Sequence, residues 1–354
     1  MLPRLLACLI AALALSFGFA FSLPQDGPNL NPRFRGLNPD ENDHVTYAQK
    51  IRETGGLVRF PAAEIRAARA TGQPEGDDLR TYAETHQPPL YYISGALLGG
   101  SLTALRVLSA LVGLATVALA FRAARDVLPE FPEASWGAAG LMACLPAFAQ
   151  LSGAANNDPL TTLFCTGIFW RLGLLVRRGM SFRDACILAA WIGAGLWTKL
   201  TVLQLFPLVV IAAWLGRNAS TEPPTTGGQG GNLEVQGGVL AALRRRKNAK
   251  GNVFVLAALA LVLALLLALP WLVRNQLLYG DPFNLSIFPL TAPAGTPTPQ
   301  FMQSIPQLGL TSGTYLWLVA YRSLATVFYL LPPNQLCDRP GQRCSWPRLC
   351  WPGW

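Results

Sequence analysis

Long apolar runs separated by short charged segments dominate the chain, and several have the length of about 20 residues that a helix needs to cross a hydrocarbon core. Seven such runs are Leu5–Leu23, Val107–Phe121, Ala134–Gly153, Pro159–Val176, Ala185–Thr198, Leu200–Gly216 and Asn252–Val273. An eighth, Thr314–Leu331, is weaker because Arg322 lies in its middle, where a charge costs about 2.5–3.5 kcal/mol. The pattern predicts an all-α, polytopic membrane protein with about seven or eight transmembrane helices.

The composition agrees with this class. Of 354 residues, 51% are hydrophobic and 13% are charged, whereas an average soluble domain carries about 25% charge. The apolar content excludes a disordered chain, and cysteines without framework spacing exclude a disulfide scaffold. Four of the seven cysteines lie inside apolar runs, where they act as small hydrophobic residues: Cys8, Cys144, Cys165 and Cys186.

The net charge of +9 is explained by topology rather than by nucleic acid, because Lys and Arg accumulate in short cytoplasmic loops. With the N-terminus inside, the short inner segments hold twelve basic residues and the short outer segments hold two, Lys199 and Arg274. The inner set is Arg4, Arg122, Arg125, Arg177, Arg178, Arg183, Arg217, Arg244, Arg245, Arg246, Lys247 and Lys250. We therefore predict a multi-pass protein of the plasma (inner) membrane with a cytoplasmic N-terminus and no nucleic-acid partner.

Two assignments in this scheme have alternatives. The first apolar run could be a cleaved signal peptide, but it is longer than the usual signal core, which favours a retained anchor. Residues 185–216 would form a helix of about 48 Å if unbroken, well beyond the bilayer core. We therefore predict two short spans that meet near Lys199 at the outer face.

These spans divide the chain into consecutive regions. Residues 1–23 form a transmembrane anchor, residues 24–104 an extracytoplasmic loop, and residues 105–216 transmembrane helices two to six. A cytoplasmic basic linker follows at 217–251, then helices seven and eight with an outer loop at 252–331, and an atypical tail at 332–354.

The first loop holds ten of the nineteen acidic residues and both histidines. Within it, Asp43–Thr54 places Val45, Ala48 and Ile51 on one helical face, and Ala62–Ala70 has a similar pattern. We expect both to be short helices on the membrane surface. Leu90–Leu105 is predicted to be a further interfacial helix rather than a span.

Polar residues gather at the predicted outer ends of the spans. A charge beside hydrocarbon is costly unless it is paired or functional, so these boundaries suggest a site. Each has a simpler explanation. Asp40 and Glu41 could form the acidic first turn of a surface helix, Asn157 or Asp158 could cap a span, and the outer Lys199 and Arg274 could be interfacial anchors.

The order of these polar segments resembles the GT-C superfamily of membrane glycosyltransferases, in the branch of the protein O-mannosyltransferases and the lipid A aminoarabinose transferase (family 39-like). The segments that carry the resemblance are Pro39-Asp40-Glu41 with His44 and Tyr47, His86-Gln87-Pro88-Pro89-Leu90-Tyr91-Tyr92, Asn156-Asn157-Asp158, Gly195-Leu196-Trp197-Thr198-Lys199, Pro270-Trp271 with Arg274-Asn275, and Tyr279-Gly280-Asp281-Pro282-Phe283.

The resemblance implies transfer of a sugar from a polyprenyl-phosphate donor to a glycan, lipid or protein acceptor at the extracytoplasmic face. It assigns catalytic roles to Asp40, with Glu41 beside it, and to Asp158. A carboxylate would take the acceptor proton, and cations would stabilise the departing phosphate. The candidate substrate-binding residues are His44, His86, Tyr91, Asn157, Lys199 and Arg274.

The cofactor is left open, with a divalent metal ion as a candidate. Hard oxygen donors and imidazoles suited to such an ion occur in the first loop, but no tight spacing selects a ligand set. They are Asp40, Asp43, His44, Glu84 and His86.

The end of the sequence departs from the family. Residues 337–354 hold three cysteines and three tryptophans, a composition unlike the preceding chain, and suggest a truncated or frame-shifted product. Two other functions remain as alternatives. One is a transporter for a lipid or polymer, which would need more charges at mid-membrane than Arg171 and Arg322. The other is a non-catalytic membrane assembly subunit.

Overall fold

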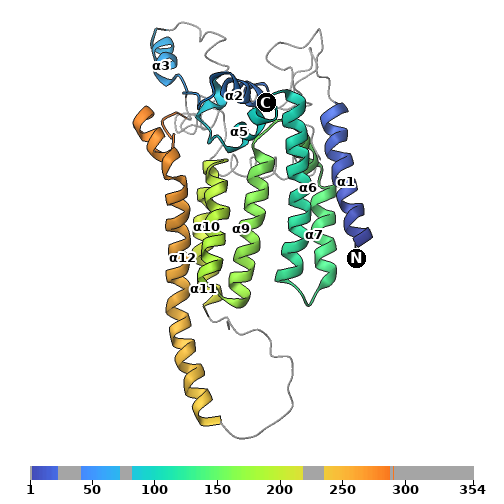
Figure 1. Cartoon of the computed structure of the whole chain (residues 1–354), viewed down its shortest axis with the longest axis vertical. Helices are drawn as coiled ribbons and strands as arrows, with labels where there is room; N and C mark the ends of the chain where they lie inside the picture. Colours follow the sequence, from blue (N-terminus) through green and yellow to red (C-terminus); the bar gives the residue numbers. More distant parts are fainter. Residues whose placement is uncertain (1, 23–40, 72–81, 218–234, 288–289, 291–354) are drawn as a thin grey trace, which may run out of the picture.

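The computed structural model describes residues 2–22, 41–71, 82–217, 235–287 and 290, and all regular elements of these residues are helical. The longer helices stand side by side and the shorter ones gather at one end (Figure 1). Asp40, the predicted eighth span Thr314–Leu331 and the atypical tail lie outside the described residues. The protein is an all-α membrane protein, as the apolar pattern predicts.

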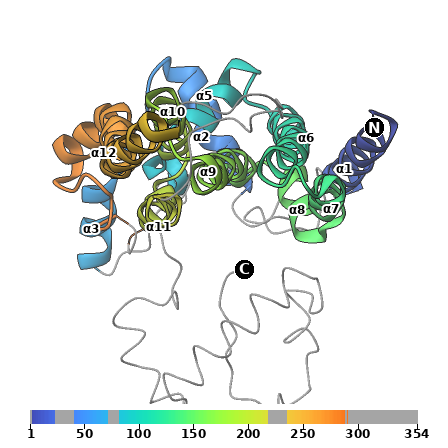
Figure 2. The same cartoon turned by 90° about the horizontal axis from the view of Figure 1, so that it is seen from below.

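The helices follow the apolar runs in chain order. They are α1 (Leu2–Ser22), α6 (Leu102–Val127), α7 (Pro132–Cys144), α8 (Pro146–Gly153), α9 (Asp158–Arg178), α10 (Phe182–Leu196), η3 (Leu200–Leu205), α11 (Phe206–Gly216) and α12 (Val235–Tyr279). Seen from below, they form a curved row with α1 at one end and α12 at the other (Figure 2). Small residues allow close packing in this row: a Cβ on Gly173 would lie 2.7 Å from a Val127 methyl group.

Three of the described helices have the length and apolar content to cross a bilayer: α6, α9 and the Val253–Tyr279 part of α12. The expected span Ala134–Gly153 is instead the pair α7 and α8, bent by 60° at Leu145 and counted as a fourth candidate. Pro146 explains the break, because proline disfavours a helical conformation at the residue before it. Shorter apolar helices cover Leu6–Gly18 and Leu200–Gly216, so the length criterion gives fewer full spans than the seven or eight expected.

Two region boundaries differ from the expected ones. Helix α6 begins at Leu102 rather than at residue 105, because the Ser101 hydroxyl accepts a hydrogen bond from the Ala104 amide and caps it. Helix α12 begins at Val235, inside the expected basic linker. Residues 239–250 contain Val, Leu, Ala, Arg, Lys and Asn without Pro or Gly, and most of these positions favour a helix.

The chain breaks its helical path at Trp197–Lys199, between α10 and η3, where two short spans were expected to meet. The amide of Leu90 donates to the carbonyl of Trp197 at 2.9 Å, which attaches the first loop to this break. The Trp197 indole also donates to the carbonyl of Leu267 at 2.7 Å. The break is therefore tied both to the first loop and to α12.

Short helices of the first loop cover one end of the row. They are α2 (Glu41–Thr54), α3 (Ala62–Ala70), η2 (Ala83–His86) and α5 (Leu90–Leu97). Ala48 and Ile51 are buried, and Val45 packs against the same cluster with Tyr91 and Leu105. The two expected surface helices are thus present, and α5 is the short helix expected after residue 90, ending at Leu97 before Gly99 and Gly100, which both have positive φ.

The basic residues of the short connections lie at the opposite end of the row. Helices α6, α9 and α11 run away from the first loop and end there, and α10 starts there (Figure 1). The arginines at these helix ends are Arg122, Arg125, Arg177, Arg178, Arg183 and Arg217. The molecule therefore has one end covered by the first loop and a second end rich in arginine.

Candidate functional site

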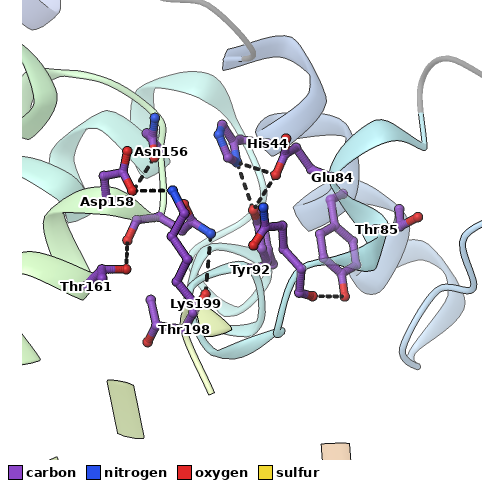
Figure 3. Close-up of polar contacts among 12 residues, drawn as sticks. His44, Glu84, Thr85, Tyr92, Asn156, Asp158, Thr161, Thr198 and Lys199 are labelled. Carbon is purple, nitrogen blue, oxygen red and sulfur yellow. Dashed lines mark hydrogen bonds and ion pairs between the residues drawn. The ribbon is translucent and has the colours of Figure 1, made fainter. Parts of the chain in front are cut away.

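An ion pair between Asp158 and Lys199 lies at the end of the row that carries the first loop (Figure 3). Lys199 Nζ donates to Asp158 Oδ1 at 2.5 Å, and the two side chains are 25% and 34% exposed. Asp158 is the first residue of α9 and Lys199 follows the end of α10. The charge of Asp158 is favoured by its own helix, since a helix dipole stabilises an anion at the N-terminus.

The residues before Asp158 hold this pair in place. The Asn156 side-chain oxygen accepts from the Asp158 amide at 2.8 Å. Asn157 makes no side-chain cap on α9, so the capping explanation for this residue is wrong. Its Nδ2 instead donates to the carbonyl of Thr198 at 3.3 Å, which ties the start of α9 to the residue before Lys199. Among the residues that the structure describes, the buried Asn157 Oδ1 has no hydrogen-bond partner.

Glu41 is the first residue of α2, so it lies in an acidic first turn as the simpler explanation predicts. Its side chain is nevertheless buried. Arg106 donates from Nε to Oε1 at 2.9 Å and from Nη2 to Oε2 at 2.7 Å. The amide of Ala155 donates to Oε1 at 2.7 Å. Since both oxygens are occupied, Glu41 acts as an anchor that joins α2, α6 and the segment leading to Asp158.

Sequence reasoning missed Arg106, which directly precedes the predicted apolar run Val107–Phe121. Its side chain is 0% exposed and lies inside α6, four residues after the helix start. A single arginine near the start of an otherwise apolar span is a usable signal, because such a charge is rare unless paired. The first loop offers several acids, so the signal would have indicated a buried carboxylate partner without identifying it.

His44 lies one turn after Glu41 in α2 and is 4% exposed. Its Nδ1 is 2.8 Å from the Tyr92 hydroxyl and 3.8 Å from Glu84 Oε2. The Tyr92 hydroxyl donates to Glu84 Oε2 at 3.4 Å. Burial raises the pKa of Tyr92 well above its ordinary value, so this phenol keeps its proton.

Tyr91, expected to bind substrate, faces the protein core. It is 0% exposed, and its hydroxyl lies 2.9 Å from Ser109 Oγ and 3.3 Å from the Leu105 carbonyl. The neighbouring Tyr92 reaches His44 instead. Tyr91 therefore packs α5 against α6 and leaves no free polar group for a ligand.

His86 and Arg274 belong to a second group around residues 58–60. Arg274 Nη2 donates to the Val58 carbonyl at 2.7 Å, and its guanidinium lies 4.7 Å from the centre of the Trp271 ring. The His86 ring packs edge-on against Phe60, and its carbonyl accepts from Asn284 at 2.8 Å. Among the described residues, no direct hydrogen bond or ion pair joins this group to the Asp158–Lys199 pair.

The described residues contain no group of three or more His, Cys, Asp or Glu side chains that could hold a metal ion. His44 and Glu84 come together, but both already bond to Tyr92. Asp40 lies outside the described residues. The side chains of the described residues therefore do not fit a metal centre.

Residues 88–225 match the family model of dolichyl-phosphate-mannose-protein mannosyltransferases. The matched segment includes Tyr91, Asn157, Asp158 and Lys199. Comparison with curated proteins and with solved structures finds no match. The match supports the resemblance to GT-C membrane glycosyltransferases that the sequence segments indicate.

Proposed function

We propose, from the mannosyltransferase-family match over residues 88–225, that this chain transfers a sugar from a polyprenyl-phosphate donor to a hydroxyl acceptor. The reaction would take place at the extracytoplasmic face, on a glycan, lipid or protein. The observation that carries the proposal is the grouping of Asp158, Lys199 and the start of α2 at one end of the bundle.

Lys199 is the proposed phosphate-binding group. An ammonium group has three donors, and the described contacts of Lys199 use one of them on Asp158. The remaining donors suit the oxygens of a lipid phosphate, which gains negative charge as the sugar leaves. Asp158 then orients the ammonium group. Arg274 is a second candidate cation because its buried Nη1 has no partner within the described ranges.

Asp40 is the proposed base that takes the proton from the acceptor hydroxyl. Its neighbour Glu41 is occupied by Arg106 and the Ala155 amide, so Glu41 is proposed as a positioning residue rather than a proton acceptor. These three hydrogen bonds fix the first residue of α2 beside the segment leading to Asp158. Asp40 directly precedes this fixed point.

The orientation follows the positive-inside rule. The end with Arg122, Arg125, Arg177, Arg178, Arg183 and Arg217 is proposed to face the cytoplasm. The Asp158–Lys199 pair would then face the outside, where a lipid-linked sugar translocated across the membrane would be presented. This orientation also places the N-terminus in the cytoplasm.

The test is sugar transfer by the full chain in vesicles that contain polyprenyl phosphate mannose, with a native membrane extract as acceptor. We expect Asp40→Asn to lower the release of polyprenyl phosphate about 100-fold or more, because it removes a general base. Arg125→Ala is the matched control, since this exposed residue lies at the other end and should leave transfer unchanged. Transfer by Asp40→Asn at the unmodified rate would remove Asp40 from its role.

A further inference from the structure

A chain of three side chains leads from Glu84 to His44. Tyr92 stands between them, with its hydroxyl 2.8 Å from His44 Nδ1 and 3.4 Å from Glu84 Oε2. Tyr92 is fully buried, and its ring stacks on His44 and packs against Tyr47. The three groups therefore hold one fixed arrangement.

The proton positions follow from the donor and acceptor inventory. An ionised carboxylate accepts only, and a phenol has one proton to give. When the Tyr92 hydroxyl donates to Glu84 Oε2, its oxygen is left to accept from His44 Nδ1. The proton of the neutral imidazole then lies on Nδ1, and Nε2 carries a lone pair.

The other ring nitrogen of His44 is Nε2. Within the part of the chain that the structure describes, no group forms a hydrogen bond with His44 Nε2. In the view of Figure 3, the His44 ring lies between Glu84 on one side and Asn156 with Asp158 on the other. The His44 side chain is 5% exposed.

We propose that Glu84 is a positioning residue that, acting through Tyr92, fixes the tautomer of His44 so that Nε2 accepts a hydrogen bond from a hydroxyl group of the transferred sugar. The inference rests on the proposed function and names a residue that the family resemblance does not assign to the substrate. A sugar is bonded directly to the phosphate of its carrier. In this proposal, a phosphate held at Lys199 carries its sugar on the side of His44.

The tautomer can be read by ¹⁵N NMR of the full chain in nanodiscs at about pH 8, above the ordinary His pKa of about 6.5. The chain has 2 histidines, so His86→Gln assigns the His44 signals by removing the others. We expect the unmodified protein to carry its proton on Nδ1. Glu84→Ala frees the Tyr92 proton for His44 Nδ1 and should shift the population to the Nε2-protonated form. Glu84→Gln keeps a carbonyl acceptor for Tyr92 and should retain the original tautomer.

The ligand is tested with two probes, polyprenyl phosphate mannose and the same polyprenyl phosphate without sugar. We expect the first probe to shift the His44 Nε2 signal and the second to leave it unchanged. Glu84→Ala should weaken binding of the sugar-bearing probe by about 3- to 10-fold, the size of one hydrogen bond, with Glu84→Gln close to the unmodified protein.

Several outcomes would overturn the inference. A proton on Nε2 in the unmodified protein, or an unchanged tautomer in Glu84→Ala, removes the role of Glu84. An equal Nε2 shift with both probes assigns the contact to phosphate and not to sugar. If neither probe binds, the proposed function itself fails, while the tautomer measurement still decides whether Glu84 controls His44.

Discussion

The Glu41–Arg106 pair at the site end of the helix row is more buried than the ion pairs at the opposite end, where Arg171 and Asp184 are 8% and 21% exposed. At the end that carries the candidate site, Glu41 and Arg106 pair with both side chains 0% exposed. At the opposite end, Arg122 pairs with Asp126 while 60% of its side chain remains exposed, and Arg177 and Glu130 are also well exposed. A buried pair costs desolvation and a surface pair costs little, so the site end carries charges that the fold has placed at an energetic cost.

The largest expected effect concerns Arg106. Arg106→Leu leaves the Glu41 carboxylate buried without its partner and should lower the free energy of unfolding by about 3–5 kcal/mol. Arg122→Leu at the opposite end should lower it by about 0–1 kcal/mol. Reversible unfolding in mixed detergent measures both. Equal losses in the two variants would contradict the contrast between the ends.

A double variant separates the effect of the buried charge on stability from the effect of packing between α2 and α6. Replacing Glu41 and Arg106 together by leucine removes the uncompensated charge, so part of the lost stability should return. The double replacement should nevertheless reduce sugar transfer, because α2 loses its bond to Ala155.

An intermediate effect is expected for the Asp158–Lys199 pair, which is partly exposed. A double-mutant cycle with Asp158→Ala and Lys199→Ala should give a coupling energy of about 0.5–1 kcal/mol. The matched cycle on Arg122 and Asp126, spaced four residues apart in one helix, should give about 0.3–0.5 kcal/mol. A larger coupling in the second cycle would reverse the expected order.

The smallest effect concerns the titration of Glu130 at the arginine-rich end. A hydrogen bond from Arg177 lowers the pKa of Glu130 to about 2. A carboxyl with a lowered pKa stabilises the fold above its unfolded pKa of about 4.3, and this contribution disappears as the pH falls toward 2. Arg177→Gln should raise the pKa toward the ordinary value, as followed by carbon NMR. Arg178→Gln, whose partner is Asp184, should leave it unchanged.

The sequence predicts the helices of this protein well where apolar periodicity is clear. The surface helix Ala62–Ala70 has the expected bounds, and Asp43–Thr54 differs only by an earlier start at Glu41. The predicted helix bounds are wrong where a single proline or capping residue, rather than the length of the apolar run, sets the end of a helix. Pro146 divides one expected span, and the Ser101 cap starts α6 at Leu102, ahead of the predicted apolar run Val107–Phe121.

The candidate site is less accessible to sequence reasoning. Each polar segment can be recognised by itself, but the pairing of Asp158 with Lys199 depends on how the antiparallel helices α9 and α10 align their ends. The preference of His44 for Tyr92 over Tyr91 depends on which face of α5 contacts α2. Both contacts depend on how helices pack against one another, and helix packing does not produce a periodic pattern in the sequence.

The order of the site residues along the chain has a practical consequence. Glu41, His44, Asp158 and Lys199 all precede Gly216, where α11 ends at the arginine-rich end, and Arg274 follows in α12. If the gene were divided between Gly216 and Val235, the first four of these residues would lie on one polypeptide and Arg274 would lie on the other. When the two polypeptides are expressed together, the amount or the sequence of the α12 polypeptide could be changed without changing the other one.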